Sequence, residues 1–206
     1  MTKTPIFLKW LFPSLVWDIK TNQKEIFLTF DDGPIPKVTE FVLDQLAIYH
    51  AKATFFCVGD NILKHPQVFQ KIISDGHAIG NHTHTHLKGW NNSMEKYLAD
   101  FNACGNAIKQ YLNYDSNIFR PPYGRITPAQ SAAILNSHRI IMWSVLSKDY
   151  DKSYDEKLCL KNTLVATKSG SIVLFHDSLK ARKNLYFVLP QFLKHFSDLG
   201  YSFKAL

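Results

Sequence analysis

Short apolar runs rich in Ile, Val and Phe alternate along this chain with longer segments in which apolar positions recur every three or four residues. Runs of this kind are typical of parallel strands that are buried on both faces. They predict strands near 26–30, 53–57, 77–80, 117–120, 139–144, 171–176 and 201–204. The segments between them predict helices over 38–49, 66–75, 93–111, 155–167 and 184–198, and another that starts at Thr127.

Local signals support the predicted helix ends. Ser93 is a suitable N-cap, because its side-chain oxygen can accept a hydrogen bond from the first turn. Pro66 suits a first helical turn, and Gly76 suits the residue that follows a helix end. Repeated strand–helix units imply parallel strands joined by right-handed crossovers. The predicted fold class is therefore α/β, with a distorted or incomplete (β/α) barrel of about seven parallel strands.

The length and composition fit one domain. The chain has 206 residues, of which 46% are hydrophobic and 20% charged, as in ordinary globular proteins. No repeat, low-complexity tract or linker divides it, so we expect residues 1–206 to form a single domain. We expect residues 1–24 to pack on that domain, because Lys9 and Pro13 interrupt their apolar stretches and leave them too short to span a membrane.

The N-terminal segment also bears on the location of the protein. It lacks the basic, apolar and small-residue pattern of a signal peptide. This favours a cytoplasmic protein and leaves export by another route as the alternative. A membrane-surface anchor is a second interpretation of the segment, supported by Trp10 and Trp17.

The formal net charge is +7, and the whole excess lies in the second half of the chain. A basic half can attract a polyanion. The chain has no dense run of Lys and Arg and no basic helix stripe, so we expect a solvated surface and no nucleic-acid partner. The three cysteines, Cys57, Cys104 and Cys159, are odd in number and widely spaced. They form neither a disulfide framework nor a C-x-x-C zinc motif.

Residues suited to bond-breaking chemistry follow several of the predicted strands. They are Asp31 and Asp32 after the first strand, Arg120 after the fourth, Asp149 after the fifth and His176 after the sixth. The segment His82–His86, which follows the third strand, adds three histidines. In α/β sheets and barrels, sites gather at the carboxyl ends of strands. We therefore expect these residues to share one active site.

The histidine spacing indicates a metal site. His82 and His86 are four residues apart, so both imidazoles can reach one point, on a helix or in a tight loop. Two histidines and one carboxylate form a three-ligand site that leaves room for water or substrate. Asp31 or Asp32 could supply the carboxylate. Adjacent residues at a strand end point in opposite directions, so one aspartate can bind the metal while the other accepts a proton.

The remaining candidates suit acid catalysis and substrate binding. His176 can act as a general acid, because imidazole changes its charge near neutral pH, and Asp149 could orient it. Arg120 could hold a carboxylate in place by paired hydrogen bonds. The backbone N–H of Tyr123, in a turn stiffened by prolines, could face developing oxyanion charge. The candidate walls for a small apolar group such as a methyl are Leu174, Tyr150 and Trp143.

Taken in order, these motifs resemble the polysaccharide deacetylases of the NodB-homology type, carbohydrate esterase family 4. The matching segments are Thr29–Pro34, His82–His86, Arg120–Gly124 and Leu174–His176. A fourth motif, often D-x-x-D-W in the family, departs from the pattern. Leu146 replaces its first aspartate and Tyr150 its tryptophan, whereas Asp149 is kept.

The resemblance implies a role for each matching residue. Asp31 would be the catalytic base, and Asp32, His82 and His86 the metal ligands. His176 would be the general acid, tuned by Asp149. The groove wall and acetate pocket would include Arg120 and Leu174. His84 falls at a variable position of its motif and receives no ligand role.

The implied function is that of a metal-dependent hydrolase that removes acetyl groups from N-acetylated sugars, such as the N-acetylglucosamine units of a polysaccharide or oligosaccharide. The expected metal is Zn²⁺, with Co²⁺, Ni²⁺ or Fe²⁺ as alternatives. Two other interpretations remain open. A non-haem iron oxygenase also uses two histidines and one carboxylate, and a non-catalytic carbohydrate-binding relative could keep the same fold. No feature of the sequence indicates an oligomeric state.

Overall fold

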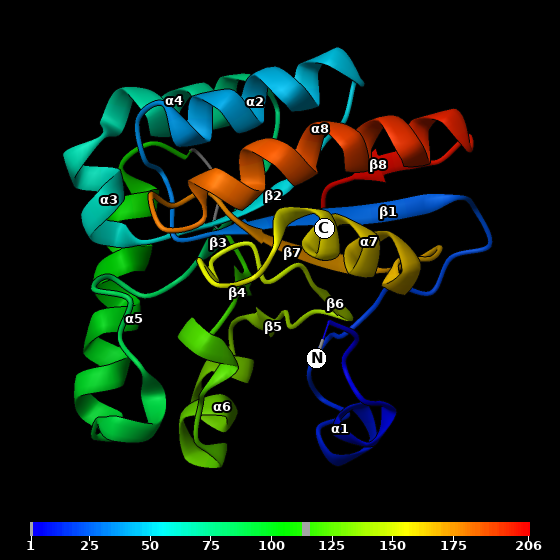
Figure 1. Ribbon diagram of the computed structural model, residues 1–206. Helices are drawn as coiled ribbons and strands as arrows, with labels where there is room; N and C mark the ends of the chain where they lie inside the picture. Colours follow the sequence, from blue (N-terminus) through cyan, green and yellow to red (C-terminus); the bar gives the residue numbers. More distant parts are fainter. Residues whose placement is uncertain (1, 113–115) are drawn as a thin grey trace.

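A curled sheet of parallel strands forms the centre of the protein (Figure 1). The computed structural model describes residues 2–112 and 116–206. Within these, the strands are β1 (Glu25–Asp31), β2 (Thr54–Cys57), β3 (Ala78–Asn81), β4 (Ile118–Phe119), β5 (Arg139–Ile140), β6 (Val145–Leu146), β7 (Ile172–His176) and β8 (Ser202–Lys204). Their order in the sheet is β5-β4-β3-β2-β1-β7-β6, and β8 pairs with the first residues of β1. The predicted incomplete barrel of about seven parallel strands is confirmed.

The curl of the sheet follows from its two end strands. Ile140 in β5 and Val145 in β6 lie at opposite ends of the strand order. Five residues of extended chain span at most about 18 Å, so the two ends of the sheet must approach each other. The prediction of one strand over 139–144 was therefore wrong. The intervening residues leave the β4 edge and cross to β7, where Ser144 donates its N–H to Ile172.

The N-terminal segment lies between these two edges. Val16 accepts a hydrogen bond from the N–H of Met142 at 2.7 Å and donates to Ile140 at 2.9 Å. Further upstream, the carbonyl of Thr2 accepts a hydrogen bond from Leu146 at 2.7 Å. The helix α1 (Ile6–Leu11) connects these two contacts. Over the described part of the chain, no helix combines the length and apolar composition that crossing a bilayer requires.

The other helices surround the sheet. They are α2 (Val38–Ile48), α3 (Gly59–Lys64), α4 (Pro66–Ser74), α5 (Met94–Lys109), α6 (Pro128–Leu135), α7 (Glu156–Ala166) and α8 (Arg182–Asp198). Helices α2, α4 and α8 lie on one side of the sheet and α1, α5 and α6 on the other (Figure 1). The six helices predicted from periodicity are confirmed, and Ser93 caps α5 by accepting a hydrogen bond from Lys96. Helices α1 and α3 were not predicted, because six residues are too few to display a helical period.

Alternation along β1 separates the core from the site. Leu28 and Phe30 belong to the main hydrophobic cluster under the helices, where Phe30 stacks on Phe55 and Phe175. Side chains of adjacent strand residues point to opposite faces. Thr29 and Asp31 therefore point to the other face, where both contact the same guanidinium. This alternation places a carboxylate at the concave face of the sheet.

Candidate metal centre and active site

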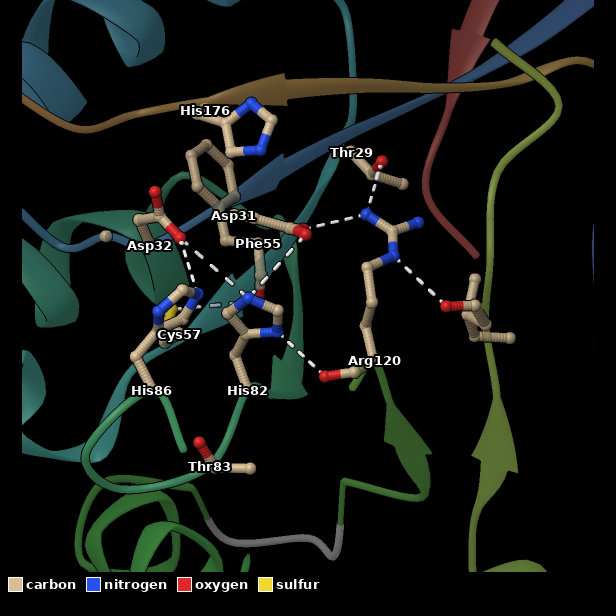
Figure 2. Close-up of polar contacts among 12 residues, drawn as sticks. Thr29, Asp31, Asp32, Phe55, Cys57, His82, Thr83, His86, Arg120 and His176 are labelled. Atoms are coloured by element: carbon tan, nitrogen blue, oxygen red, sulfur yellow. Dashed lines mark hydrogen bonds and ion pairs between the residues drawn. The ribbon is translucent and has the colours of Figure 1, made fainter. Parts of the chain in front are cut away.

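The carboxyl ends of neighbouring strands bring the predicted site residues together. Asp31 ends β1 and lies beside His176, its register partner at the end of β7. His82 follows β3, and Arg120 follows β4. These two strands are neighbours, and His82 contacts the carbonyl of Arg120. Because parallel strands end at the same edge of a sheet, side chains from four segments meet there (Figure 2).

Three of these side chains form a candidate metal centre. The ligand atoms of Asp32, His82 and His86 all lie within 4.8 Å of one another. One oxygen of Asp32 is 3.2 Å from Nε2 of His86 and 3.8 Å from Nε2 of His82. Two donors that each lie about 2.1 Å from a tetrahedral zinc ion are about 3.4 Å apart. The chemistry and the separation of the donors therefore fit a small divalent cation.

His82 has the protonation state and tautomer that a ligand needs. Its Nδ1 lies 2.7 Å from the carbonyl oxygen of Arg120, which can only accept, so Nδ1 carries the proton. Nε2 is therefore free to bind a cation. Burial lowers the pKa of His82 to about 4 despite the nearby charge of Asp31, so the ring is neutral at pH 7. This is the tautomer that the metal interpretation requires.

The other two ligand candidates lie in turns with unusual backbone angles. Asp32 has φ 83° and His86 has φ 56°, the left-handed region that aspartate tolerates better than most side chains. The carbonyl of Asp32 accepts a hydrogen bond from Asn61 at 2.7 Å. Burial raises the pKa of Asp32, but its hydrogen bond to His86 and the nearby histidine charges outweigh burial and lower the pKa below its ordinary value. Asp32 is therefore ionised.

Asp31 is held at one oxygen and free at the other. Its Oδ1 accepts a hydrogen bond from Arg120 at 2.7 Å, and its Oδ2 lies 3.7 Å from Nε2 of His82. The guanidinium is fully buried and also donates to Thr29 and to the carbonyls of Ile141 and Met142. Arg120 is thereby fixed on several sides. Figure 2 shows the carboxylate of Asp31 between Arg120 and His82.

His176 is held by a buried carboxylate. Its Nδ1 and its backbone N–H both lie 2.8 Å from oxygens of Asp149. Ser147 donates a further hydrogen bond to Asp149. Burial lowers the pKa of His176, but the charge and hydrogen bond of Asp149 raise it to about 9 overall. At neutral pH the imidazolium therefore carries a proton on Nε2, the nitrogen that Asp149 does not hold.

A cavity of about 630 Å³ contains these groups. The predicted residues that line it are Asp31, Asp32, His82, His86, Tyr123, Trp143, Tyr150, Leu174 and His176. The two others, Arg120 and Asp149, lie behind the cavity wall and act on Asp31 and His176. Leu146, at the departure in the fourth motif, also lines the cavity. Tyr150 packs edge-on against His176 at 4.9 Å, so the substituted aromatic residue still forms a wall.

Three cations at the rim of this cavity were not predicted. Lys88 lies over the ring of Tyr123 and Lys180 over that of Tyr150. Arg125 also lines the cavity and lies 4.8 Å from the ring of Trp90. None of them belongs to a motif, so the sequence contained no signal for them. Each of the three cations is attracted to the face of the aromatic ring beside it, which helps to hold it at this rim.

Asp177 is a further residue to which the sequence analysis assigned no role. Its Oδ1 accepts a hydrogen bond from the N–H of Gly33 at 3.0 Å, and its Oδ2 accepts one from Thr39 at 2.6 Å. Its own N–H donates to the carbonyl of Asp31. Burial raises the pKa of Asp177 to about 7. Asp177 thus clamps the turn that carries Asp32. In the sequence, its position directly after His176 at the end of a predicted strand was the one feature that could have indicated a role.

The chain is similar to known deacetylases over most of its length. A family model described as polysaccharide deacetylase matches residues 18–140. A peptidoglycan-N-acetylglucosamine deacetylase of Bacillus cereus is 34% identical over 191 residues, which cover 92% of this chain and 89% of the relative. Chitin deacetylase 2 of Saccharomyces cerevisiae is 36% identical over 82% of this chain, which spans 54% of the yeast protein.

A solved structure agrees with these sequence relationships. The crystal structure of a peptidoglycan N-acetylglucosamine deacetylase in complex with 4-naphthalen-1-yl-N-oxidanyl-benzamide superposes with a TM-score of 0.89. The alignment covers 98% of this chain and 95% of that one, at 29% identity. The chain therefore belongs to the polysaccharide deacetylase family, carbohydrate esterase family 4 with the NodB-homology fold, and is a deacetylase.

Proposed function

We propose that the protein is a divalent-metal-dependent hydrolase that removes acetyl groups from N-acetylglucosamine units of a polysaccharide or oligosaccharide. The observation that carries the proposal is the grouping of three metal-ligand atoms within 4.8 Å, beside the free oxygen of Asp31. A bound divalent cation, with Zn²⁺ expected and Co²⁺, Ni²⁺ or Fe²⁺ as alternatives, would polarise the acetyl carbonyl and acidify a water molecule. Asp32, His82 and His86 would hold it.

Asp31 is suited to act as the general base. Arg120 occupies its Oδ1, which fixes the carboxylate and leaves Oδ2 directed at the cavity. In this geometry Oδ2 would accept a proton from a water molecule as that water attacks the acetyl carbon. Arg120 is fully buried, so its contribution is to position Asp31.

His176 is suited to act as the general acid. Because its pKa is raised to about 9, it is protonated at neutral pH. Its Nε2 would donate that proton to the sugar nitrogen as the C–N bond breaks, so acetate and a free amine leave. The backbone N–H of Tyr123 would donate a hydrogen bond to the oxyanion of the tetrahedral intermediate. Leu174, Trp143 and Tyr150 would enclose the acetyl methyl group.

Acetate release tests the proposal directly. The metal-loaded protein is expected to release acetate from N-acetylated glycans, and removal of the metal with a chelator is expected to abolish release until Zn²⁺ is restored. Metal removal should also lower the melting temperature, because a ligand that binds only the folded state stabilises it. Full activity after verified metal removal would contradict the proposal.

The same experiment separates the two other interpretations. A non-catalytic carbohydrate-binding relative would bind the glycan panel without releasing acetate. A non-haem iron oxygenase would turn over 2-oxoglutarate in the iron-loaded form. The parallel sheet and the family relationship weigh against the oxygenase. The cytoplasmic location stays a prediction, since it rests on the pattern of the N-terminal segment alone.

Asp149→Asn is expected to shift the pH dependence of the reaction. In the unmodified protein, kcat/KM should fall as the pH rises through about 9, because His176 then loses its proton. Asp149 is the largest of the influences that raise the pKa of His176 against burial, so without its charge the pKa should fall and the alkaline limb should move to lower pH. The pH profile of kcat/KM measures the shift. Ser147→Ala, which keeps the charge, serves as the control, and an unmoved limb in Asp149→Asn would assign that limb to another group.

Asp177→Ala is expected to weaken metal binding without removing a ligand. The substitution frees the N–H of Gly33 and loosens the turn that carries Asp32. Partners that orient metal ligands typically contribute about tenfold or more to metal affinity. Calorimetric titration of the apoprotein with Zn²⁺ measures the loss. Thr39→Val, which removes the hydrogen bond to the other oxygen of Asp177 together with the acceptor of the Ile35 N–H, keeps the contact with Gly33 and should cost less. Unchanged affinity in Asp177→Ala would show that the clamp is dispensable.

A further inference from the structure

Helix α1 exposes a group of large apolar side chains. Ile6 is 65% exposed, Phe7 59%, Trp10 76% and Leu11 64%. No residue of this helix is buried. Other exposed apolar residues, such as Val165, lie on other elements, and single exposed apolar residues are normal. Four exposed apolar side chains on one short helix form a contiguous apolar patch, unlike the single residues elsewhere.

The opposite side of the same helix is apolar as well. Leu8 packs against a buried cluster that includes Leu15 and Trp17. A helix whose apolar side chains point in several directions is normally surrounded by apolar material. Here the protein covers the side that carries Leu8, and Lys9 of the same helix pairs with Asp18. The outer side of α1 therefore presents an apolar surface that its own fold does not cover.

The helix is held in a fixed position. Before it, Thr4 donates its N–H to Ser144 at 2.9 Å, and after it, Val16 donates to Ile140 at 2.9 Å. These two contacts join the segment to both edges of the sheet. Figure 1 places α1 on the side of the sheet opposite to α2, α4 and α8, near the N-terminus. The exposed side chains are thus presented by an anchored element.

Positive charge lies directly beside α1. A cavity of about 840 Å³ is lined by Pro5 and Ile6 at the start of the helix and by four lysines. The lysines are Lys3, Lys9, Lys20 and Lys168. One acidic residue, Asp18, lines the same cavity and pairs with Lys9. Among the described residues, the other three lysines form no ion pair, so this hollow carries an excess of positive charge.

We propose that α1 and these lysines dock the protein on the surface of an anionic phospholipid bilayer. Aromatic and aliphatic side chains of α1 would enter the boundary between head groups and acyl chains, where tryptophan is favoured. Lys3, Lys20 and Lys168 would contact the head-group phosphates. The combination of an apolar patch and adjacent cations distinguishes this partner from a neutral lipid or an uncharged glycan.

The proposed docking surface on α1 lies close to the metal-centre cavity. An apolar cavity of about 570 Å³ lies against the inner side of α1, at Leu8 and Phe12, and extends to Tyr123 and Trp143. These last two residues also line the metal-centre cavity. Docking through α1 would therefore bring the bilayer next to a cavity that shares its walls with the candidate active site. The docking itself goes beyond the proposed deacetylation and does not depend on it.

Vesicle binding tests the proposal. The full chain is expected to sediment with vesicles that contain about one third phosphatidylglycerol and to remain in solution with phosphatidylcholine vesicles. Raising the salt from about 0.05 to about 0.5 M should weaken binding, because the lysine contacts are screened. The emission of tryptophan should shift to shorter wavelength on binding. Absence of binding to the anionic vesicles at low salt would overturn the proposal.

Matched variants distinguish binding through α1 and its neighbouring lysines from non-specific adsorption to the vesicles. The triple variant Phe7→Ser, Trp10→Ser and Leu11→Ser should bind at least about tenfold more weakly. The control replaces exposed apolar residues on other elements, Ile48→Ser, Val165→Ser and Leu179→Ser, and should bind normally. Lys3→Gln, Lys20→Gln and Lys168→Gln should weaken binding, whereas Lys152→Gln, Lys157→Gln and Lys161→Gln should not.

A folding defect or self-association would be recognised in the same samples. Both apolar triple variants should keep the far-ultraviolet circular dichroism of the unmodified protein and its acetate release from soluble oligosaccharides, since none of the changed residues lies in the candidate active site. Equal binding by the α1 variant and its control would overturn the proposal. So would concentration-dependent dimerisation that requires α1 and occurs without vesicle binding, because the patch would then cover a second copy of the chain.

Discussion

Asp31→Asn is expected to keep its bound metal while its deacetylation rate falls by a factor of about 10²–10⁴, the typical effect of a lost general base. The amide oxygen of asparagine can still accept the hydrogen bond of Arg120, so the turn should keep its shape. The amide nitrogen that replaces Oδ2 cannot accept a proton from water. Metal content and kcat on an N-acetylated oligosaccharide, measured on the same preparation, check the expectation.

His82→Ala is the matched comparison for Asp31→Asn. It removes a donor atom of the candidate metal centre, so metal content and turnover should fall together. Near-native activity in Asp31→Asn would refute Asp31 as the base. Loss of the metal in Asp31→Asn would instead make this aspartate a ligand, which would reverse the roles assigned to Asp31 and Asp32.

His176→Ala should lower the rate on N-acetyl sugars by a factor of about 10²–10⁴. It should lower the rate on an activated ester much less. An amine is a poor leaving group until it is protonated, so amide cleavage depends on the acid. The nitrophenolate of 4-nitrophenyl acetate leaves without a proton. The ratio of kcat/KM for the two substrates therefore isolates the acid function from binding and from metal loading.

Tyr150→Phe provides the control for this experiment. It keeps the aromatic ring that packs against His176 at 4.9 Å and removes only the hydroxyl group. Its substrate ratio should equal that of the unmodified protein. An equal fall on both substrates in His176→Ala would mean that the residue maintains the cavity rather than donating the proton.

The sequence predicted most of the sheet because buried parallel strands are short and continuously apolar. It failed where tertiary contacts decide the structure. Residues 140–143 form a continuous apolar run, yet only Arg139–Ile140 belongs to a strand, and the residues after it cross between the edges of the sheet and pair with the N-terminal segment. No periodicity within six residues could distinguish such a crossing from a strand. Helices α1 and α3 were missed for the related reason that one or two turns display no period.

The sequence predicted which residues gather at the site, but not which of them line the cavity and which lie behind it. Strand ends meet at one edge, so the convergence of Asp31, His82 and His176 could be expected from their positions. Which side chains lie behind the cavity depends on rotamers and backbone contacts. Arg120 and Asp149 are buried behind it. The clamp by Asp177 involves a backbone N–H, a partner that no residue pattern reveals.

The cationic rim bears on the pattern of modification along a polymer. Each deacetylation creates an amine that is partly protonated near neutral pH. Lys88, Arg125 and Lys180 line the cavity, so they should repel a chain segment that already carries such amines. Successive units would then react less readily than isolated ones. A deacetylase with this rim is expected to leave free amines scattered along its substrate rather than in contiguous blocks.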